Sequence, residues 1–309
     1  MLNRAFILAT VVLWLGSMAW LVVDKIMPSF YDGDLPVASG LNANEPVAWE
    51  VEWSGKHVGF AVSLLREGIQ GTTEVHNQLA LDEVPMLELA PAWMRSTVEG
   101  MGNLRFVAKT RIEFDSLDNF SAFESGISIN DVAGIVKMSG RVKESDLHLK
   151  IQSGTLNVSH TITIPDQAAL NEALFPDAKL PYMYVGRHWQ EQVYNPFANP
   201  SEPIDRVDAN VVEAELIEHG VERKRVLRVD YHSSSAVGVS DKARLRAQTW
   251  VLPNGVVLKQ VVYLANAKLS FRRLEGEKVT ELANKFFPLL MSEAKLRKEI
   301  AGKEKPALP

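Results

Sequence analysis

The chain of 309 residues contains seven histidines, the side chains best suited to bind metals or to carry protons near neutral pH. They are spread along the sequence as His57, His76, His148, His160, His188, His219 and His232. No two stand at the spacing that puts two ligands on one face of a helix or strand, so we predict no metal site and no cofactor. His160 alternates with the apolar face of a strand, beside Val158 and Ile162. We interpret it as a buried, hydrogen-bonded core residue, with a catalytic or ligand-binding histidine as the alternative.

The serines and glycines form no recognised catalytic motif. There is no Gly-x-Ser-x-Gly sequence, and the run Ser233-Ser234-Ser235 lacks an adjacent oxyanion-hole pattern. Gly55-Lys56 lacks the glycine spacing and the following Ser or Thr of a phosphate-binding loop. We therefore predict a protein that is not an enzyme. The enzyme alternative is a hydrolase of unrecognised type, which would need His160 or another titratable group in a cleft beside a carboxylate or hydroxyl.

Aromatic side chains gather in one stretch, LPYMYVGRHWQEQVYNPF, over Leu180–Phe197. Since aromatic residues dominate ligand and partner contacts, this stretch is the candidate ligand or partner surface. Its members are Tyr182, Tyr184, Trp189, Tyr194 and Phe197. The alternative is structural, with the aromatic rings capping the open end of a sheet. A second candidate surface is a basic stripe on one strand face, formed by Arg105, Lys109 and Arg111, which would face solvent or anionic lipid headgroups.

Composition limits the class of partner. The formal net charge of −5 argues against a nucleic-acid surface, which is normally basic, and we predict no nucleic-acid partner. The absence of cysteine excludes disulfides, thiolate zinc sites and a lipoprotein cysteine.

The N-terminal segment predicts a membrane anchor. Ala5–Val23 contains no charge and is long enough to approach the roughly 30 Å hydrocarbon core as a helix. Ser17-Met18-Ala19 fits a signal-peptidase site, but the apolar run continues beyond it, which favours a retained anchor over a cleaved signal. Arg4 places the N-terminus in the cytoplasm. We expect a single-pass protein of the inner (cytoplasmic) membrane, with the bulk of the chain extracytoplasmic.

The rest of the chain reads mainly as strands. Apolar and polar residues alternate on both sides of Ser54-Gly55, which predicts a hairpin, and Pro253-Asn254-Gly255 predicts another tight turn. About a dozen such strands predict a mainly β (α+β) fold, a curved antiparallel sheet or half-open barrel. Helices are expected at Leu87–Met101, at Gln167–Phe175 and at Lys278–Ala301, the last interrupted at Pro288.

These elements predict a simple division of the chain. Residues 1–25 form the anchor, 26–45 a stalk punctuated by proline and glycine, and 46–275 the β domain. The β domain divides into halves at 46–165 and 180–275, which reflect either a duplication or the general similarity of β meanders. Residues 276–309 form a C-terminal helix and tail.

Three short stretches, WSGKHVG, LPYMYVGRHW and WVLPNGVVLKQ, together with the anchor, resemble bacterial periplasmic β-sheet proteins of the lipoprotein-localisation-carrier type. The resemblance implies a half-open barrel with helices over its mouth and an affinity for acyl chains. The expected function is thus a membrane-tethered, non-enzymatic protein that binds an apolar or lipid-like ligand in a curved sheet. The alternative is a structural or partner-binding domain of an envelope membrane complex.

Overall fold

The structure is a computed structural model of the whole chain. It describes residues 41–303, apart from 69–70, 86–102, 118, 131, 145, 155, 164–169, 173–174, 195–203, 234–243 and 265–266, and, before residue 41, residues 13, 14, 16, 17 and 20. The chain divides into two compact units, Met1–Leu35 and Pro36–Pro309. Most of the predicted anchor, Ala5–Val23, lies outside the described residues, and so does the helix expected at Leu87–Met101. Within the part that the structure describes, no helix is long and apolar enough to cross a membrane.

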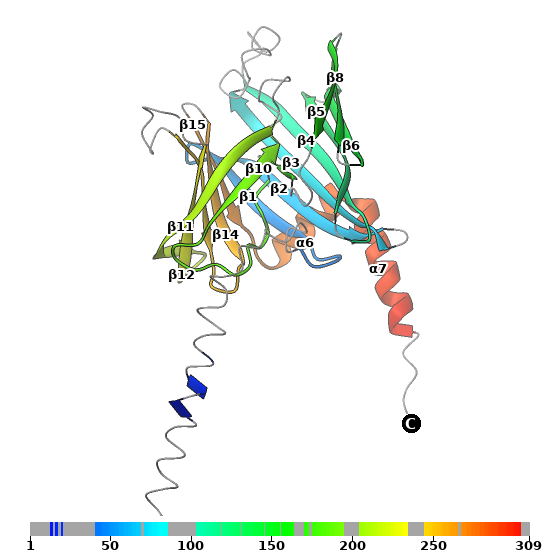
Figure 1. The fold of residues 1–309 in the computed structure, drawn as a ribbon. Coiled ribbons are helices and arrows are strands. Elements are labelled where there is room, and N and C mark those ends of the chain that lie inside the picture. Colours follow the sequence, from blue (N-terminus) through cyan, green and yellow to red (C-terminus); the bar gives the residue numbers. More distant parts are fainter. Residues whose placement is uncertain are drawn as a thin grey trace, which may run out of the picture. The chain divides into compact units, whose positions relative to one another are not determined.

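The second unit is built on one sheet of fifteen strands (Figure 1). The first eight are β1 (Val47–Trp53), β2 (Lys56–Glu67), β3 (Thr73–Pro85), β4 (Asn103–Phe114), β5 (Phe120–Ile129), β6 (Val132–Lys143), β7 (Asp146–Ser153) and β8 (Leu156–Thr163). The other seven are β9 (Leu170–Glu172), β10 (His188–Tyr194), β11 (Ile204–His219), β12 (Glu222–Ser233), β13 (Leu245–Val251), β14 (Val257–Leu264) and β15 (Ala267–Arg273).

The strand order is that of two meanders joined in the middle. It runs β8-β7-β6-β5-β4-β3-β2-β1-β15-β14-β13-β12-β11-β10-β9, so nearly every strand pairs with its neighbour in sequence. The two meanders are joined by the pairing of β1 with β15, in which Trp49 lies opposite Arg273. All pairs are antiparallel except β9 with β10. The sheet stays open at β8 and β9, which confirms the prediction of a mainly β, antiparallel, unclosed sheet, with more strands than the dozen expected.

Both predicted hairpin turns are present. Ser54 and Gly55 have φ angles of 49° and 88°, the two positive values that a tight turn between twisted strands requires. In the second, Gly255 has φ of 88° and its N–H donates to the carbonyl of Leu252 at 2.8 Å. A Cβ on Gly255 would lie 2.6 Å from the carbonyl oxygen of Leu180, so only glycine fits there.

Alternation along the strands gives the sheet two different faces. The core face carries the largest fully buried side chains, among them Trp49, Phe106 and Phe271. The opposite face, which we call the helix face, carries the two C-terminal helices. This division follows from the two-residue period of a strand, because successive side chains point to opposite sides.

The helix predicted at Lys278–Ala301 is present as two helices, α6 (Glu277–Phe286) and α7 (Pro288–Lys303), and the break comes at Pro288 as expected. Proline lacks the N–H that would continue α6, but it suits the first position of α7. The buried Leu282 and Ala283 pack with Met291 over Ala48, Val62 and Leu64 on the helix face of β1 and β2.

The helix predicted at Gln167–Phe175 is wrong where the structure describes it. Leu170–Glu172 form the short strand β9, which pairs with Gln192–Tyr194 of β10. A segment this short gains little as an isolated helix, whereas the free edge of β10 offers backbone donors and acceptors.

Candidate functional site

The aromatic segment predicted as a binding surface is held in place by a buried arginine. Nη1 of Arg187 donates to the carbonyls of Pro181, at 2.7 Å, and Tyr182, at 3.0 Å. Burial lowers the pKa of Arg187 below its ordinary value, while the charge of Tyr184 opposes this. Tyr182 itself is 73% exposed and has a positive φ of 58°. No motif in the sequence indicated that Arg187 would organise this turn.

Trp189 completes the cluster. The Arg187 guanidinium lies 5.5 Å from the centre of its ring, and Tyr231 meets that ring edge-on at 6.1 Å. Arg187 thus contacts the backbone of Tyr182 and of Tyr184 and the ring of Trp189, in an arrangement that fixes the path of the chain. Tyr194 lies in β10, but its side chain is not described, and Phe197 is outside the described residues. A ligand or partner at these residues stays a prediction.

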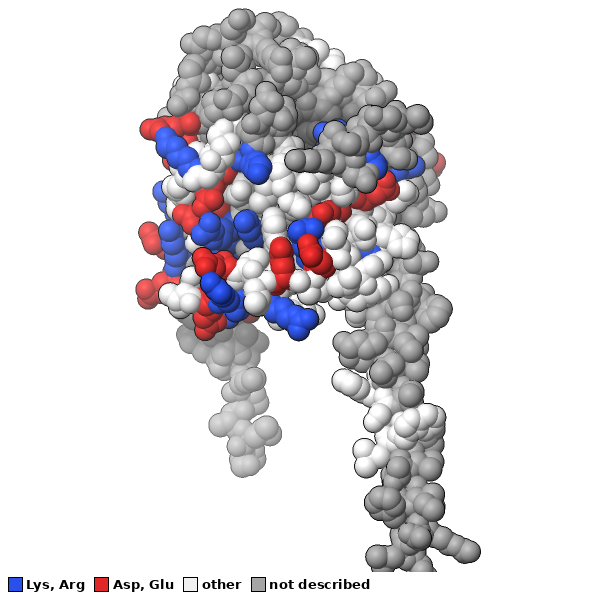
Figure 2. Space-filling model, turned by 90° about the vertical axis from the view of Figure 1, so that its left-hand side faces the viewer, with Lys and Arg blue, Asp and Glu red and all other residues white. Residues whose placement is uncertain are grey.

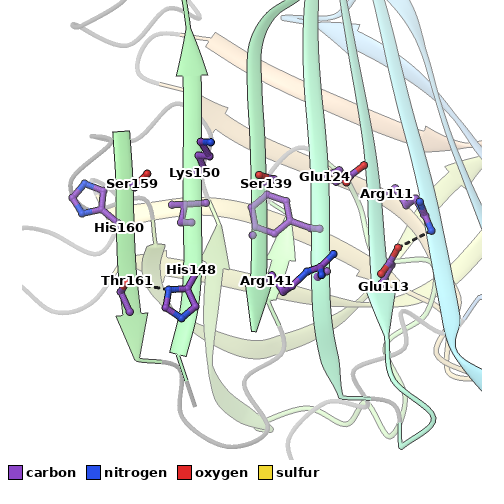
Figure 3. Close-up of a pocket in the computed structure, with 14 residues that line it drawn as sticks. Arg111, Glu113, Glu124, Ser139, Arg141, His148, Lys150, Ser159, His160 and Thr161 are labelled. Carbon is purple, nitrogen blue, oxygen red and sulfur yellow. Dashed lines mark hydrogen bonds and ion pairs between the residues drawn. The ribbon is translucent and has the colours of Figure 1, made fainter. Parts of the chain in front are cut away.

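His160 is not the core residue that the sequence predicted. It lies on β8 opposite Leu149 and on the core face, as its alternation indicated, but it is only half-buried. The reason is that β8 is the edge of the sheet and has a neighbour on one side only. Leu156 on the same strand is exposed for the same reason. In Figure 3 the His160 ring lies at the outer side of β8.

The helix face of β4–β8 is a continuous polar surface. Side chains directly opposite one another form rows across these strands. One row contains Arg111, Glu124, Ser139, Lys150 and Ser159, and the next contains Glu113, Ala122, Arg141, His148 and Thr161 (Figure 3). A groove of about 490 Å³ follows these two rows.

A second groove, of about 580 Å³, lies beside the first and reaches the junction of α6 and α7; we call it the helix-face groove. Among the residues that line it are His76, Gln78, Lys109, Arg111, Glu124, Gly126, Lys137, Ser139, Lys150, Gln152, Phe286 and Phe287. Phe286 and Phe287 are half-buried, Phe286 at the end of α6 and Phe287 between the two helices, whereas the polar residues belong to the sheet. The groove therefore has an aromatic end and a cationic end.

Glu124 also lines the sheet end of the groove, but three lysines there have no ion-pair partner among the described residues. Lys109, Lys137 and Lys150 are exposed, and none of them forms an ion pair with another described residue. Arg111 differs, because it binds Glu74 at 2.8 Å and Glu113 at 2.6 Å. The three lysines thus leave positive charge in the groove of a chain whose net charge is −5.

Glu74 and His76 link this surface to the helices. Nε2 of His76 lies 3.0 Å from Oε2 of Glu74, and the ring centre of His76 lies 6.3 Å from that of Phe287. Burial lowers the pKa of His76, and its bond to Glu74 only partly offsets this. Burial alone would raise the pKa of Glu74, but hydrogen bonds from His76 and Arg111 outweigh it and lower that pKa. At neutral pH the cluster therefore holds a neutral imidazole and an ionised carboxylate.

The helix face of the other meander is organised differently. Arg228 lies 3.0 Å from Glu213 and 3.2 Å from Asp230, and Arg272 lies 3.2 Å from Glu52. Figure 2 shows basic and acidic side chains intermixed on the side of the molecule formed by these later strands. Because these charges form ion pairs with one another, they are less able to bind a charged ligand than the lysines of the helix-face groove.

Two common kinds of catalytic site, a metal centre and a serine activated by a lysine, are not present among the described residues of the polar rows. Among the described residues, no group of three or more His, Asp or Glu side chains could hold a metal ion. Ser139 stands opposite Lys150, but both are exposed to solvent. A lysine that activates a serine is normally desolvated, so this pair lacks the required surroundings.

The basic stripe is the part of this site that was predicted from the sequence. Lys109 and Arg111 do share one face of β4 with Arg105, as predicted. The contributions of Lys137, Lys150, Phe286 and Phe287 were missed. They come from distant strands and from the helix junction, and the pairings that bring them together cannot be read from a single strand.

No known protein-family model matches the chain, and no curated protein matches it. Three solved structures are distantly similar. A beta-barrel-like protein of the domain of unknown function DUF1849 from Brucella abortus is 7% identical, with a TM-score of 0.46 over 74% of this chain and 95% of that one. A DUF1089 family protein from Pseudomonas aeruginosa is 13% identical, with a TM-score of 0.33 over 64% and 87%. A protein from Bacteroides fragilis described as exported, with a YmcC-like fold, is 8% identical, with a TM-score of 0.26 over 76% and 97%. The chain thus bears a distant structural resemblance to these proteins in its large antiparallel sheet.

Proposed function

We propose that this protein is a membrane-tethered, extracytoplasmic and non-enzymatic protein that binds a lipid-like amphiphile in the helix-face groove. The observation that carries the proposal is the pairing of two half-buried phenylalanines with an open polar groove of about 580 Å³. That volume falls within the range of small-molecule sites, about 300–1,000 Å³.

The sequence predicted an apolar or lipid-like ligand in a curved sheet without assigning it to either face, and the packing favours the helix face. Trp49 and Phe271 are fully buried on the core face, and Phe106 is 1% exposed. Well-packed side chains of this kind leave little free volume, because protein interiors are as dense as organic crystals. A ligand on the core face would have to displace them, whereas the helix-face groove is already open.

The aromatic end of the groove suits an acyl chain. Phe286 and Phe287 lie at the junction where α6 ends and α7 begins, with their rings only half-covered by the protein. Each methylene of an acyl chain moved from water onto such a surface contributes up to about 0.8 kcal/mol. The polar row beside them keeps the other end of the ligand in contact with water, which is the arrangement that an amphiphile requires.

Calorimetric titration of the folded protein with oleate tests the proposal. We expect saturable binding that is weakened at least about tenfold by Phe287→Ala, since several methylene contacts are lost. Leu289→Ala is the matched control, because Leu289 is a neighbouring apolar residue that is 78% exposed and does not line the groove. Equal affinities of both variants, or no binding by the wild type, would contradict the proposal.

A further inference from the structure

The cationic end of the groove defines the chemical class of the ligand's head group. Lys109, Gly126 and Lys137 stand in one row across β4, β5 and β6, since Lys109 is opposite Gly126 and Gly126 is opposite Lys137. Neighbouring strands are about 4.8 Å apart, so the two lysine backbones are separated by about 9.6 Å with a glycine between them. Two long cationic side chains thus flank a position that has no side chain.

The space above Gly126 is open. A Cβ built on this glycine would meet no atom within 4 Å. Gly140 lies on the neighbouring strand β6 and on the core face, and it shows the opposite case, because a Cβ there would lie 2.3 Å from the Phe123 ring. Gly126 therefore leaves room on the surface, whereas Gly140 leaves room for a core side chain.

A third lysine, Lys150, lies near Lys137 on the same face of the sheet. Lys150 of β7 is opposite Ser139, which lies two residues from Lys137, so Lys150 is a diagonal neighbour of Lys137. Diagonal neighbours in a sheet are about 7–8 Å apart, within reach of long side chains. Both lysines line the groove together with Phe286 and Phe287.

We propose that the amphiphile bound in this groove is anionic, and that its carboxylate or phosphate head group lies over Gly126 between the ammonium groups of Lys109 and Lys137, with Lys150 as a third contact. This inference rests on the proposed function, because it assigns the head group of the same ligand. The acyl chain then runs towards Phe286 and Phe287, so the charge and the apolar surface of the groove fix the direction in which the ligand lies.

The test compares three single-chain ligands at low salt: oleate, which carries a carboxylate, a lysophosphatidylglycerol, which carries a phosphate, and monoolein, which has no charge. We expect at least one of the two anions to bind about tenfold more tightly than monoolein, and the tighter one identifies the source of the head group. Raising the salt to about 1 M should remove most of that advantage, because the Debye length then falls to about 3 Å. Equal binding of all three ligands would overturn the anionic head group and leave the proposed function standing. Binding of none of them would overturn both.

Two substitutions at Gly126 locate the head group. Gly126→Asp and Gly126→Asn add side chains of nearly equal size to the open space, and they differ in charge. If the anion lies over Gly126, the Asp variant binds it at least about fivefold more weakly than the Asn variant, the effect of one unit charge at close range in a watery site. The two variants should bind monoolein equally. Equal binding of the anion by both, with unchanged melting temperatures, would overturn the placement.

The lysines provide the second measurement. Lys109→Gln and Lys137→Gln should each weaken binding of the anion about fivefold. Lys268→Gln is the control, because Lys268 is exposed on the other meander and lies over the ring of Tyr263. A loss of binding in Lys268→Gln as large as in the other two would show attraction by the overall charge of the protein and would overturn a specific site.

Discussion

The burial of single side chains depends on the face of the strand and on the position of that strand in the sheet. Trp53 ends β1 beside the first hairpin turn and is 7% exposed, opposite Leu269 of β15. Its burial was predictable from alternation with Val51, because both point to one face of a strand. The half-exposure of His160 was not predictable in the same way. Alternation gives the face of a residue, but the edge of the sheet is decided by pairing between strands that are distant in the sequence.

Truncation of Trp53 should be costly. We expect Trp53→Ala to lower the free energy of unfolding by about 3–5 kcal/mol, the usual cost of removing a large aromatic side chain from a core. Urea denaturation measures this, with Val221→Ala as the control, because Val221 is fully exposed in the turn after β11. A loss below about 1 kcal/mol for Trp53→Ala would show that this end of the hairpin is not packed.

The Glu74–His76 pair makes a prediction about pH. Both pKa values are lowered in the folded protein, so both groups bind fewer protons there than in the unfolded chain. Their stabilising contribution is therefore present above their ordinary pKa values and is lost on acidification, for His76 as the pH falls below about 6.5. Asp177 acts in the opposite direction, since burial raises its pKa to about 6.

The comparison of wild type with His76→Gln isolates the histidine, because Asp177 is present in both. We expect the wild type to lose more stability than the variant between about pH 7.5 and about pH 5, measured by urea denaturation at each pH. Equal losses would mean that protonation of His76 is not coupled to folding.

Among the elements, the hairpins and the C-terminal helices were predictable because their signals are local. Ser54, Gly55 and Gly255 have the positive φ angles of tight turns, and Pro288 marks the break between α6 and α7. Strand β9 was missed, because its formation depends on the free edge of β10 and not on its own three residues.

The turn at Gly255 is hydrogen-bonded to the segment that contains Ala178 and Leu180. This contact leads to a prediction for the turn. The N–H of Leu180 donates to the carbonyl of Gly255 at 2.8 Å, and Arg273 donates to the carbonyl of Ala178 at 2.8 Å. Gly255→Ala should therefore destabilise the protein by well over about 1 kcal/mol, since it adds a clash with Leu180 to the strain of a positive φ.

Gly220→Ala separates these two effects. Gly220 has a positive φ of 61°, but a Cβ there meets no atom within 4 Å, so only the backbone strain remains. We expect the Gly220 variant to lose about 1 kcal/mol or less in thermal or urea denaturation. A Gly255→Ala loss no larger than that of Gly220→Ala would show that Leu180 can move away at no cost.

For the whole molecule, the sequence predicted the antiparallel class but not the strand order. The pairing of β1 with β15 joins residues more than two hundred positions apart, and no local pattern specifies it. The same pairing seats α6 over β1 and β2, and so places Phe286 and Phe287 next to the lysines of β4, β6 and β7. The candidate site thus depends on the strand order. For this reason only its basic stripe could be predicted from the sequence.

The attachment of the molecule to a membrane stays a prediction, based on the uncharged stretch Ala5–Val23. A fusion of residues 1–45 to a periplasmic reporter should remain with the membrane after alkaline extraction, as a spanning helix does. Recovery of a soluble reporter whose sequence starts at Trp20 would show instead that the segment is a cleaved signal.

The central claim, that the ligand lies on the helix face and not on the core face, is tested most directly by mapping a bound amphiphile. The full-length protein is loaded with a fatty acid that carries a photoactivatable group near the end of its chain, irradiated, digested and sequenced by mass spectrometry. We expect cross-links at the α6–α7 junction around Phe286 and Phe287, abolished by excess oleate. Competed cross-links to core-face residues such as Trp49, Phe106 or Phe271, with none at the helix junction, would contradict it.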